Sequence, residues 1–173
     1  MTDRQFQSFD ETTAPLAARD ALARAKKAFG AIPAPLARYA GSPALLTAAL
    51  AALDSFDKTS LSALEREVLA MTMGRVNGCQ FCVSLHRRLL TTQRAPAELI
   101  GALEAGSPLS DPRLEALRRF VLGLLEQHGN VDRATWLGFR EAGFSHAQAL
   151  EVVMGVSAYT LTTFANRLTE TSE

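Results

Sequence analysis

The sequence predicts an all-α protein, a compact bundle of about eight helices in a single domain of residues 1–173. The chain is rich in Ala and Leu, which are strong helix formers. No segment sustains the apolar–polar alternation that is typical of a half-buried strand. Helix start and stop signals, in contrast, recur along the whole chain.

An arm and two helices are predicted in the N-terminal third. Residues 1–10 are polar and are expected to form a loose arm. Gly30 and the prolines at positions 33 and 35 end a first helix of about residues 14–29, and a short turn is expected up to Gly41. Ser42-Pro43 has the pattern of an N-cap and first helical residue, which predicts a second helix to about residue 56.

The middle of the chain is predicted to form a helical hairpin. Ser62 and Glu65 match a capping box, which starts a strongly apolar helix of about residues 63–77. Asn77-Gly78 breaks that helix, and the next one is expected over about residues 79–91.

Four further helices are predicted in the C-terminal half. Pro96 starts the first, Asp111-Pro112 caps the second and Asp132 caps the third. Ser145 and Gln148 form another capping box, which starts the longest helix. The predicted ranges are about 96–106, 112–128, 132–142 and 145–168.

Composition and charge exclude several classes of function. Lys and Arg total 18, as do Asp and Glu, so a formally neutral chain has no broad attraction to nucleic acid or anionic membrane. No stretch approaches the roughly 20 apolar residues that span a bilayer, and the polar N-terminus lacks the apolar core of a secretory signal. We therefore expect a cytoplasmic protein that binds neither nucleic acid nor membrane.

The only two cysteines, Cys79 and Cys82, form a C-x-x-C pattern, which points to redox or metal chemistry. On a helix, Cys79, Cys82 and His86 lie on one face. Cα atoms three residues apart are roughly 5 Å apart, so the pair is expected to cycle between dithiol and disulfide without unfolding the helix. The helix N-terminus favours a thiolate at Cys79, whereas His86 can take the proton of Cys82. We favour Cys82 as the attacking thiolate and Cys79 as its resolving partner.

Glu67 is predicted to lie beside His86. With the hairpin closed, Glu67 is roughly 15 Å and His86 roughly 12 Å from the turn, at 1.5 Å per residue. The neighbours of Glu67 along its helix are apolar, and a carboxylate on such a stripe requires a partner. Among those neighbours, Gly74 permits a close approach of the two helices. Glu65 competes for the role, but the capping box already accounts for it.

Other interpretations of these residues remain open. A zinc site is the main rival, but structural zinc usually needs four ligands and only His128 and His146 remain, so we expect no cofactor and no metal. The cysteines could be inert core residues, Glu67 a surface ion-pair partner and His86 a structural histidine.

Two further groups lie near the C-terminus. Trp136, Phe139 and Phe144 are interpreted as core residues, with a substrate-pocket wall as the alternative. Five polar residues lie on an otherwise apolar helix, namely Tyr159, Thr160, Thr163, Asn166 and Arg167. Buried hydrogen bonds, an oligomer interface or a functional site would each explain them. The two remaining histidines fall at helix ends and are assigned no chemistry.

Glu67 followed by Cys79-x-x-Cys82-x-x-x-His86, with Asn77-Gly78 before the first cysteine, resembles the alkylhydroperoxidase D-like (AhpD-like) / carboxymuconolactone decarboxylase family. Residues 28–50 and 144–168 resemble the upstream and closing helices of its peroxidase-related members, so the resemblance covers most of the chain.

The resemblance implies an all-α fold assembled as trimers or hexamers, and a peroxidase whose dithiol reduces a hydroperoxide. Cys79 and Cys82 would then be the redox pair, with Glu67 and His86 as the proton relay. The best-studied members have a His where this chain has Phe81, a departure that bears on the relay, the lipoyl-type reductant and the peroxiredoxin partner. The decarboxylases proper generally lack the cysteine pair, which argues against their reaction.

The sequence thus predicts a thiol-dependent alkyl hydroperoxide reductase in antioxidant defence. Its expected partners are a hydroperoxide substrate, a dithiol or protein reductant, and further copies of the chain. The first alternative is a thiol–disulfide oxidoreductase that acts on a protein or lipoyl partner. The second is a zinc-binding or structural helical module without enzymatic activity.

Overall fold

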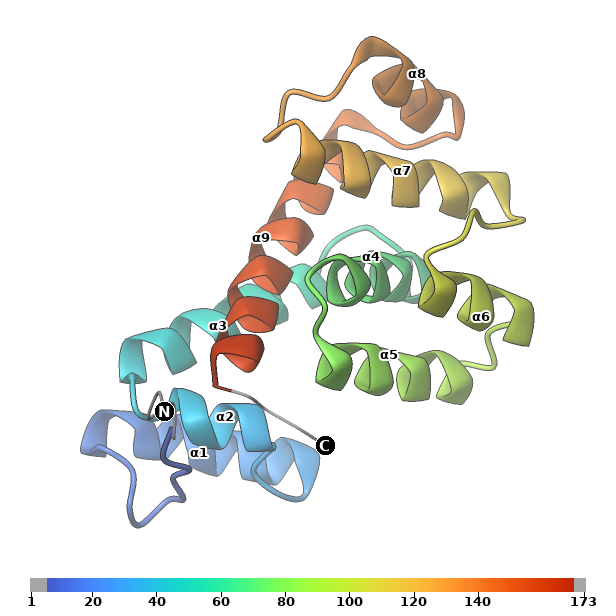
Figure 1. Ribbon diagram of the computed structural model, residues 1–173. Helices are drawn as coiled ribbons and strands as arrows, with labels where there is room; N and C mark the ends of the chain where they lie inside the picture. Colours follow the sequence, from blue (N-terminus) through green and yellow to red (C-terminus); the bar gives the residue numbers. More distant parts are fainter. Residues whose placement is uncertain (1–5, 170–173) are drawn as a thin grey trace, which may run out of the picture.

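In the computed structural model, which describes residues 6–169, every regular element is a helix (Figure 1). This confirms the predicted all-α class. The helices in the described part of the chain are α1 Leu16–Phe29, α2 Ala34–Tyr39, α3 Pro43–Asp57, α4 Ala63–Val76, α5 Gln80–Thr92, α6 Ala97–Ala105, α7 Pro112–Glu126, α8 Arg133–Glu141 and α9 His146–Leu168.

The helix α2 lies where the sequence predicted only a turn, and that prediction was wrong. Pro33 is the N-cap of α2 and Pro35 lies in its first turn. A proline is accepted there because its missing N–H would have no helical partner in any case. Leu36 and Tyr39 are buried, so packing stabilises a helix too short to be stable alone.

Other differences are confined to helix ends. The helix α1 begins after Pro15, its N-cap. The helix α7 ends before the predicted position because His128 and Gly129 both adopt positive φ. Residues 1–5 of the expected loose arm lie outside the described residues. The end of the arm is attached to the fold, since the Phe9 N–H donates to the Ala37 carbonyl.

The helix α4 lies at the centre of the fold, with α5, α6, α7 and α9 packed around it. Its capping box, with Ser62 and Glu65, is present as predicted. The helix α9 runs diagonally from α7 and α8 to α1 and α2, with α3 beside it (Figure 1). This path brings the last helix over the hairpin of α4 and α5.

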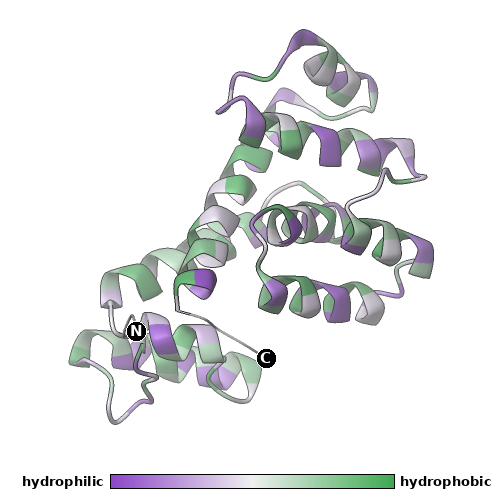
Figure 2. Cartoon of the chain, viewed as in Figure 1, coloured by the Kyte–Doolittle hydropathy of each residue, from purple (hydrophilic) through white to green (hydrophobic). Residues whose placement is uncertain are grey.

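The apolar side chains form two buried clusters. The larger cluster surrounds α4 and includes Leu69, Met71 and Phe139, and the smaller one joins α1, α2 and α3. Figure 2 shows hydrophobic residues along most of α3 and much of α9. None of the helices in residues 6–169 has both the length and the apolar character needed to cross a membrane.

Candidate active site

The turn between α4 and α5 places Cys79 at the start of α5. Asn77 is the C-cap of α4, and Gly78 has a positive φ of 64°, a conformation that favours glycine. Cys79 is the N-cap of α5, one position before the first turn in which it was expected. Its Sγ accepts a hydrogen bond from the Cys82 N–H at 3.3 Å, so this sulfur meets the positive end of the helix dipole.

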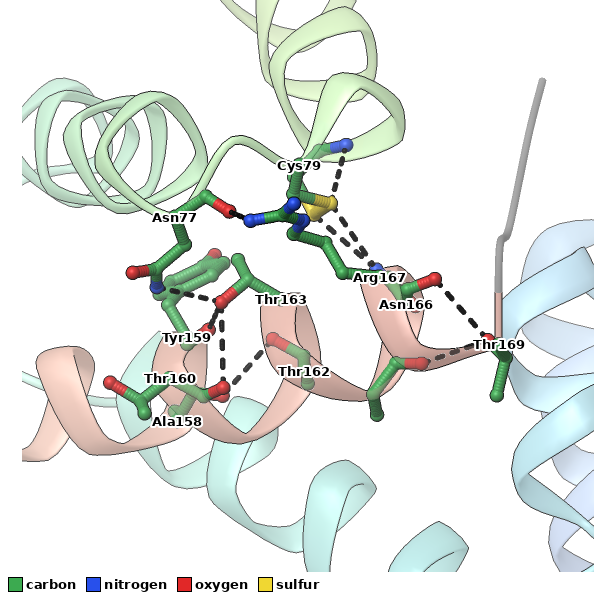
Figure 3. The surroundings of a disulfide bond; sticks show 12 residues. Asn77, Cys79, Ala158, Tyr159, Thr160, Thr162, Thr163, Asn166, Arg167 and Thr169 are labelled. Atoms are coloured by element: carbon green, nitrogen blue, oxygen red, sulfur yellow. Dashed lines mark hydrogen bonds between the residues drawn. A yellow bond between two sulfur atoms is a disulfide. The ribbon is translucent and has the colours of Figure 1, made fainter. Parts of the chain in front are cut away.

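Cys79 and Cys82 are joined by a disulfide bond (Figure 3). Their Cα atoms are 5.3 Å apart, and α5 continues from Gln80 to Thr92 without interruption. The pair is therefore bridged within an intact helix, as the spacing predicted. Both cysteines are buried, with exposures of 3% and 4%, so the sulfur atoms lie beneath the surface of the chain.

The hairpin helices approach closely at the cysteines because position 74 is glycine. A Cβ at Gly74 would lie 3.2 Å from the Cβ of Cys82 and 3.5 Å from a methyl carbon of Val83. A side chain here would require Cys82 to move by a few tenths of an ångström. The expected close approach at Gly74 is thus confirmed.

Glu67 of α4 and His86 of α5 meet across the hairpin, as their similar distances from the turn predicted. Glu67 Oε2 lies 2.8 Å from His86 Nδ1, and the two side chains are only 13% and 7% exposed. Nδ1–H of His86 donates to the carboxylate in this arrangement. In the neutral ring, Nε2 is then the nitrogen that can accept a proton.

An aromatic side chain of α9 holds His86 from another side. The Tyr159 ring lies edge-on to the imidazole, with ring centres 5.3 Å apart and planes at 74°. Phe56 packs edge-on against Tyr159 in turn. Burial, and then the charge of Glu67, raise the pKa of Tyr159, so its hydroxyl stays protonated.

A second side chain of α9, Asn166, reaches the disulfide itself (Figure 3). Its Nδ2 lies 3.3 Å from Cys82 Sγ and 3.9 Å from Cys79 Sγ. The sequence alone did not place Asn166 at the site, although this polar residue stands out on an apolar helix. Asn166 is buried, which agrees with the buried hydrogen bonds that were one of the explanations considered.

Two neighbours of Asn166 hold the turn before Cys79 (Figure 3). Thr163 Oγ1 accepts a hydrogen bond from Asn77 Nδ2 at 2.8 Å, and Arg167 donates to the Asn77 carbonyl at 2.8 Å. Positions 163, 166 and 167 have the spacing of one helix face. That polar face on an apolar helix is the signal that could have assigned them to the site.

The remaining candidates lie elsewhere or form core. Phe139 stacks on Phe120 and Phe144, with ring centres 4.1 and 4.3 Å away, and Trp136 packs beside them. The interpretation of this aromatic cluster as core is confirmed. His146 packs against Trp136. Within residues 6–169, no three His, Cys, Asp or Glu side chains are grouped so that they could hold a metal ion.

Comparison with known proteins agrees with this geometry. Residues 46–122, which include Glu67, both cysteines and His86, match the carboxymuconolactone decarboxylase family. None of the curated proteins matches the chain.

Three solved structures are similar over most of their length. One is an uncharacterised peroxidase-related protein with an alkylhydroperoxidase AhpD core from Ralstonia eutropha (TM-score 0.81, 19% identity, 94% of this chain and 88% of that one). The second is an uncharacterised peroxidase-related protein from a Silicibacter species (TM-score 0.79, 19% identity, 99% and 92%). The third is a protein of unknown function from Agrobacterium tumefaciens (TM-score 0.65, 17% identity, 75% and 88%).

These findings confirm the resemblance drawn from the motif. The hairpin of α4 and α5 lies within the residues that match the carboxymuconolactone decarboxylase family, and the chain has the AhpD-like fold of the peroxidase-related proteins.

Proposed function

We propose that this protein is a thiol-dependent hydroperoxide reductase of antioxidant defence, with Cys79 and Cys82 as its redox pair. The observation that carries the proposal is the disulfide at the start of α5, one turn before a histidine held by a buried carboxylate. The AhpD-like fold with its cysteine pair supports a peroxidase-related role.

In the first step, the hydroperoxide oxidises Cys82. His86 takes the proton of the Cys82 thiol, and the thiolate attacks the outer oxygen of the hydroperoxide. The S–O bond forms as the O–O bond breaks. The alkoxide leaves as an alcohol after it takes the proton back from His86, and Cys82 becomes a sulfenic acid. Glu67 orients the imidazole and stabilises its protonated form.

In the second step, Cys79 resolves the sulfenic acid. Its sulfur attacks the Cys82 sulfur, the S–O bond breaks, and the hydroxide leaves as water with the proton of the Cys79 thiol. The N-cap position favours the thiolate of Cys79. A dithiol or protein reductant then returns two electrons and two protons by thiol–disulfide exchange. Phe81 cannot carry a proton, so the proposed relay uses Glu67 and His86.

The test is the consumption of an alkyl hydroperoxide with a dithiol reductant by the wild type, Cys79→Ser and Cys82→Ser. We expect Cys82→Ser to be inactive and Cys79→Ser to turn over more slowly than the wild type, because the dithiol must then reduce the Cys82 sulfenic acid directly. The control Ser84→Ala, two residues further along α5, should keep wild-type turnover. Equal turnover by the wild type and both cysteine variants would reject the proposal. Much faster reduction of a model disulfide than of any hydroperoxide would favour the oxidoreductase alternative.

The relay is tested on the reduced protein in a single turnover. His86→Gln is expected to slow the oxidation of Cys82 by about 100-fold, the usual scale of general acid–base catalysis. Glu67→Gln should slow it less, because the ring remains in place. Circular dichroism checks that both variants keep the fold. Unchanged rates in both variants would show that Glu67 and His86 have only a structural role.

We also propose that the chain forms homo-oligomers, trimers or hexamers, through α9. Large apolar side chains are exposed along one stripe of this helix, namely Leu150, Val153, Phe164 and Leu168. Phe164 and Leu168 line an open groove of about 1000 Å³, which is bordered by Leu45 of α3. Exposed apolar surface of this kind is typical of a protein interface. Light scattering should give a multiple of the chain mass for the wild type and a smaller mass for Phe164→Glu. A monomeric wild type would contradict the assignment.

A further inference from the structure

The Asn166 side chain connects the disulfide to a buried tyrosine of α2. On one side, its Nδ2 lies 3.3 Å from Cys82 Sγ. On the other side, its Oδ1 lies 2.5 Å from the hydroxyl oxygen of Tyr39. Asn166 and Tyr39 are 5% and 2% exposed, so both side chains are shielded from solvent. The contact therefore spans three helices: α2, α9 and α5.

The disulfide determines which way the amide points. Its sulfur atoms carry no hydrogen and can only accept, so the amide nitrogen faces them and Oδ1 faces Tyr39. The Tyr39 hydroxyl donates its one proton between two acceptors, Oδ1 of Asn166 and the Thr162 carbonyl oxygen, which is 2.9 Å away. Burial raises the pKa of Tyr39, so the hydroxyl keeps the proton that it donates.

We propose that Asn166 stabilises the thiolate of Cys82 by donating an amide N–H to its sulfur, with Tyr39 as the positioning residue that holds the amide. The part of this inference that concerns hydroperoxide reduction rests on the function proposed above. The stabilisation of the thiolate itself does not.

The sign of the effect follows from the strength of sulfur as an acceptor. A disulfide sulfur accepts hydrogen bonds weakly, whereas a thiolate carries a full charge and accepts them strongly. The same amide therefore stabilises the reduced, ionised state of Cys82 more than the oxidised state. Asn166 would raise both the fraction of thiolate at neutral pH and the oxidising strength of the Cys79–Cys82 pair.

Two variants separate this role from a purely structural one. Asn166→Asp keeps the size of the side chain and an oxygen that accepts from Tyr39, but it has no N–H to offer the sulfur. Asn166→Leu removes both polar contacts at similar volume. If Asn166 had only a structural role, Asn166→Asp would behave like the wild type. If Asn166 stabilises the thiolate, both variants lose this effect, and Asn166→Asp loses more because its charge repels the thiolate.

The matched control is Thr162→Val. Thr162 lies on the same helix, is also buried, and uses its hydroxyl to donate to the Ala158 carbonyl, whereas its backbone carbonyl, which accepts from Tyr39, is kept in valine. Tyr39→Phe tests the anchor, because it leaves the amide in place but removes the hydroxyl that orients it.

Two measurements are made, neither of which uses a hydroperoxide. The first is the rate of alkylation of Cys82 at neutral pH in the Cys79→Ser background, and the second is the disulfide equilibrium of the full chain with a reference dithiol. We expect both Asn166 variants to slow alkylation and to shift the equilibrium toward the disulfide, each by about tenfold or more, as for a hydrogen bond to a charged group. Tyr39→Phe should shift both in the same direction by less, and Thr162→Val should shift neither.

The inference is overturned if Asn166→Asp keeps wild-type values in both measurements, or if Thr162→Val changes them as much as the Asn166 variants do. If the Asn166 variants show the predicted shifts but the wild type reduces no hydroperoxide, the proposed function is rejected and the role of Asn166 remains supported.

Discussion

Replacing Gly155 with alanine is expected to destabilise the protein, although alanine is the better helix former. Gly155 lies where α9 crosses α3 and α4. A Cβ there would be 2.5 Å from a ring carbon of Phe56 and 2.8 Å from a methyl carbon of Leu69. Carbon atoms normally pack about 3.5–4.0 Å apart, so these groups would have to move by about an ångström. Both are buried in the core and have no free space to enter.

The magnitude is the difference between two effects. Overpacking a core typically costs about 1–3 kcal/mol, and more when the obstructing group is rigid. Replacing a glycine inside a helix with alanine contributes about 1 kcal/mol in the opposite direction. We therefore expect Gly155→Ala to lower the free energy of unfolding by up to about 2 kcal/mol.

Urea denaturation followed by circular dichroism measures the change. Gly101 of α6 and Gly138 of α8 provide matched controls, since both are exposed inside helices and a Cβ would meet no atom within 4 Å. Gly101→Ala and Gly138→Ala should raise the free energy of unfolding by up to about 1 kcal/mol. A Gly155→Ala variant as stable as these two would contradict the close packing of Gly155 against Phe56 and Leu69.

Three further predictions concern charge, the core and the disulfide. Burial alone would raise the pKa of Glu65, but hydrogen bonds from Ser62 and Arg113 lower it below its ordinary 4.5. Glu65→Gln should therefore cost about 1–2 kcal/mol at neutral pH, and urea titrations should show this cost disappearing as the pH falls through the lowered pKa of the folded state. Phe139→Ala, in the middle of the aromatic stack, should cost about 3–5 kcal/mol by the same assay, and a cost under 1 kcal/mol would contradict its place in the core. Reducing the disulfide, which spans a sequence separation of only 3, should cost at most about 2 kcal/mol and leave the far-ultraviolet circular dichroism unchanged, whereas unfolding on reduction would exclude a working redox cycle.

Most helices could be predicted because their ends depend on local chemistry. The capping boxes at Ser62 and Ser145 satisfy backbone N–H groups within three residues, so they act in the same way in any fold. The helix α2 was not predicted because its prolines are compatible with a turn after the first helix as well as with the start of another helix. Only the packing of Leu36 and Tyr39 against neighbouring helices distinguishes the helix from the turn.

The same distinction applies to the site. The parts of the site that lie on one hairpin could be predicted from the sequence, since helix geometry and a tight turn are enough to bring Glu67 to His86 and Cys79 to Cys82. Asn166 lies more than eighty positions further along the chain, and its hydrogen bond to the Cys82 sulfur arises only when the whole chain has folded. That contact depends on how α9 crosses the hairpin and on the anchor provided by α2. Such crossings are determined by core packing among residues distant in sequence, which no local pattern records.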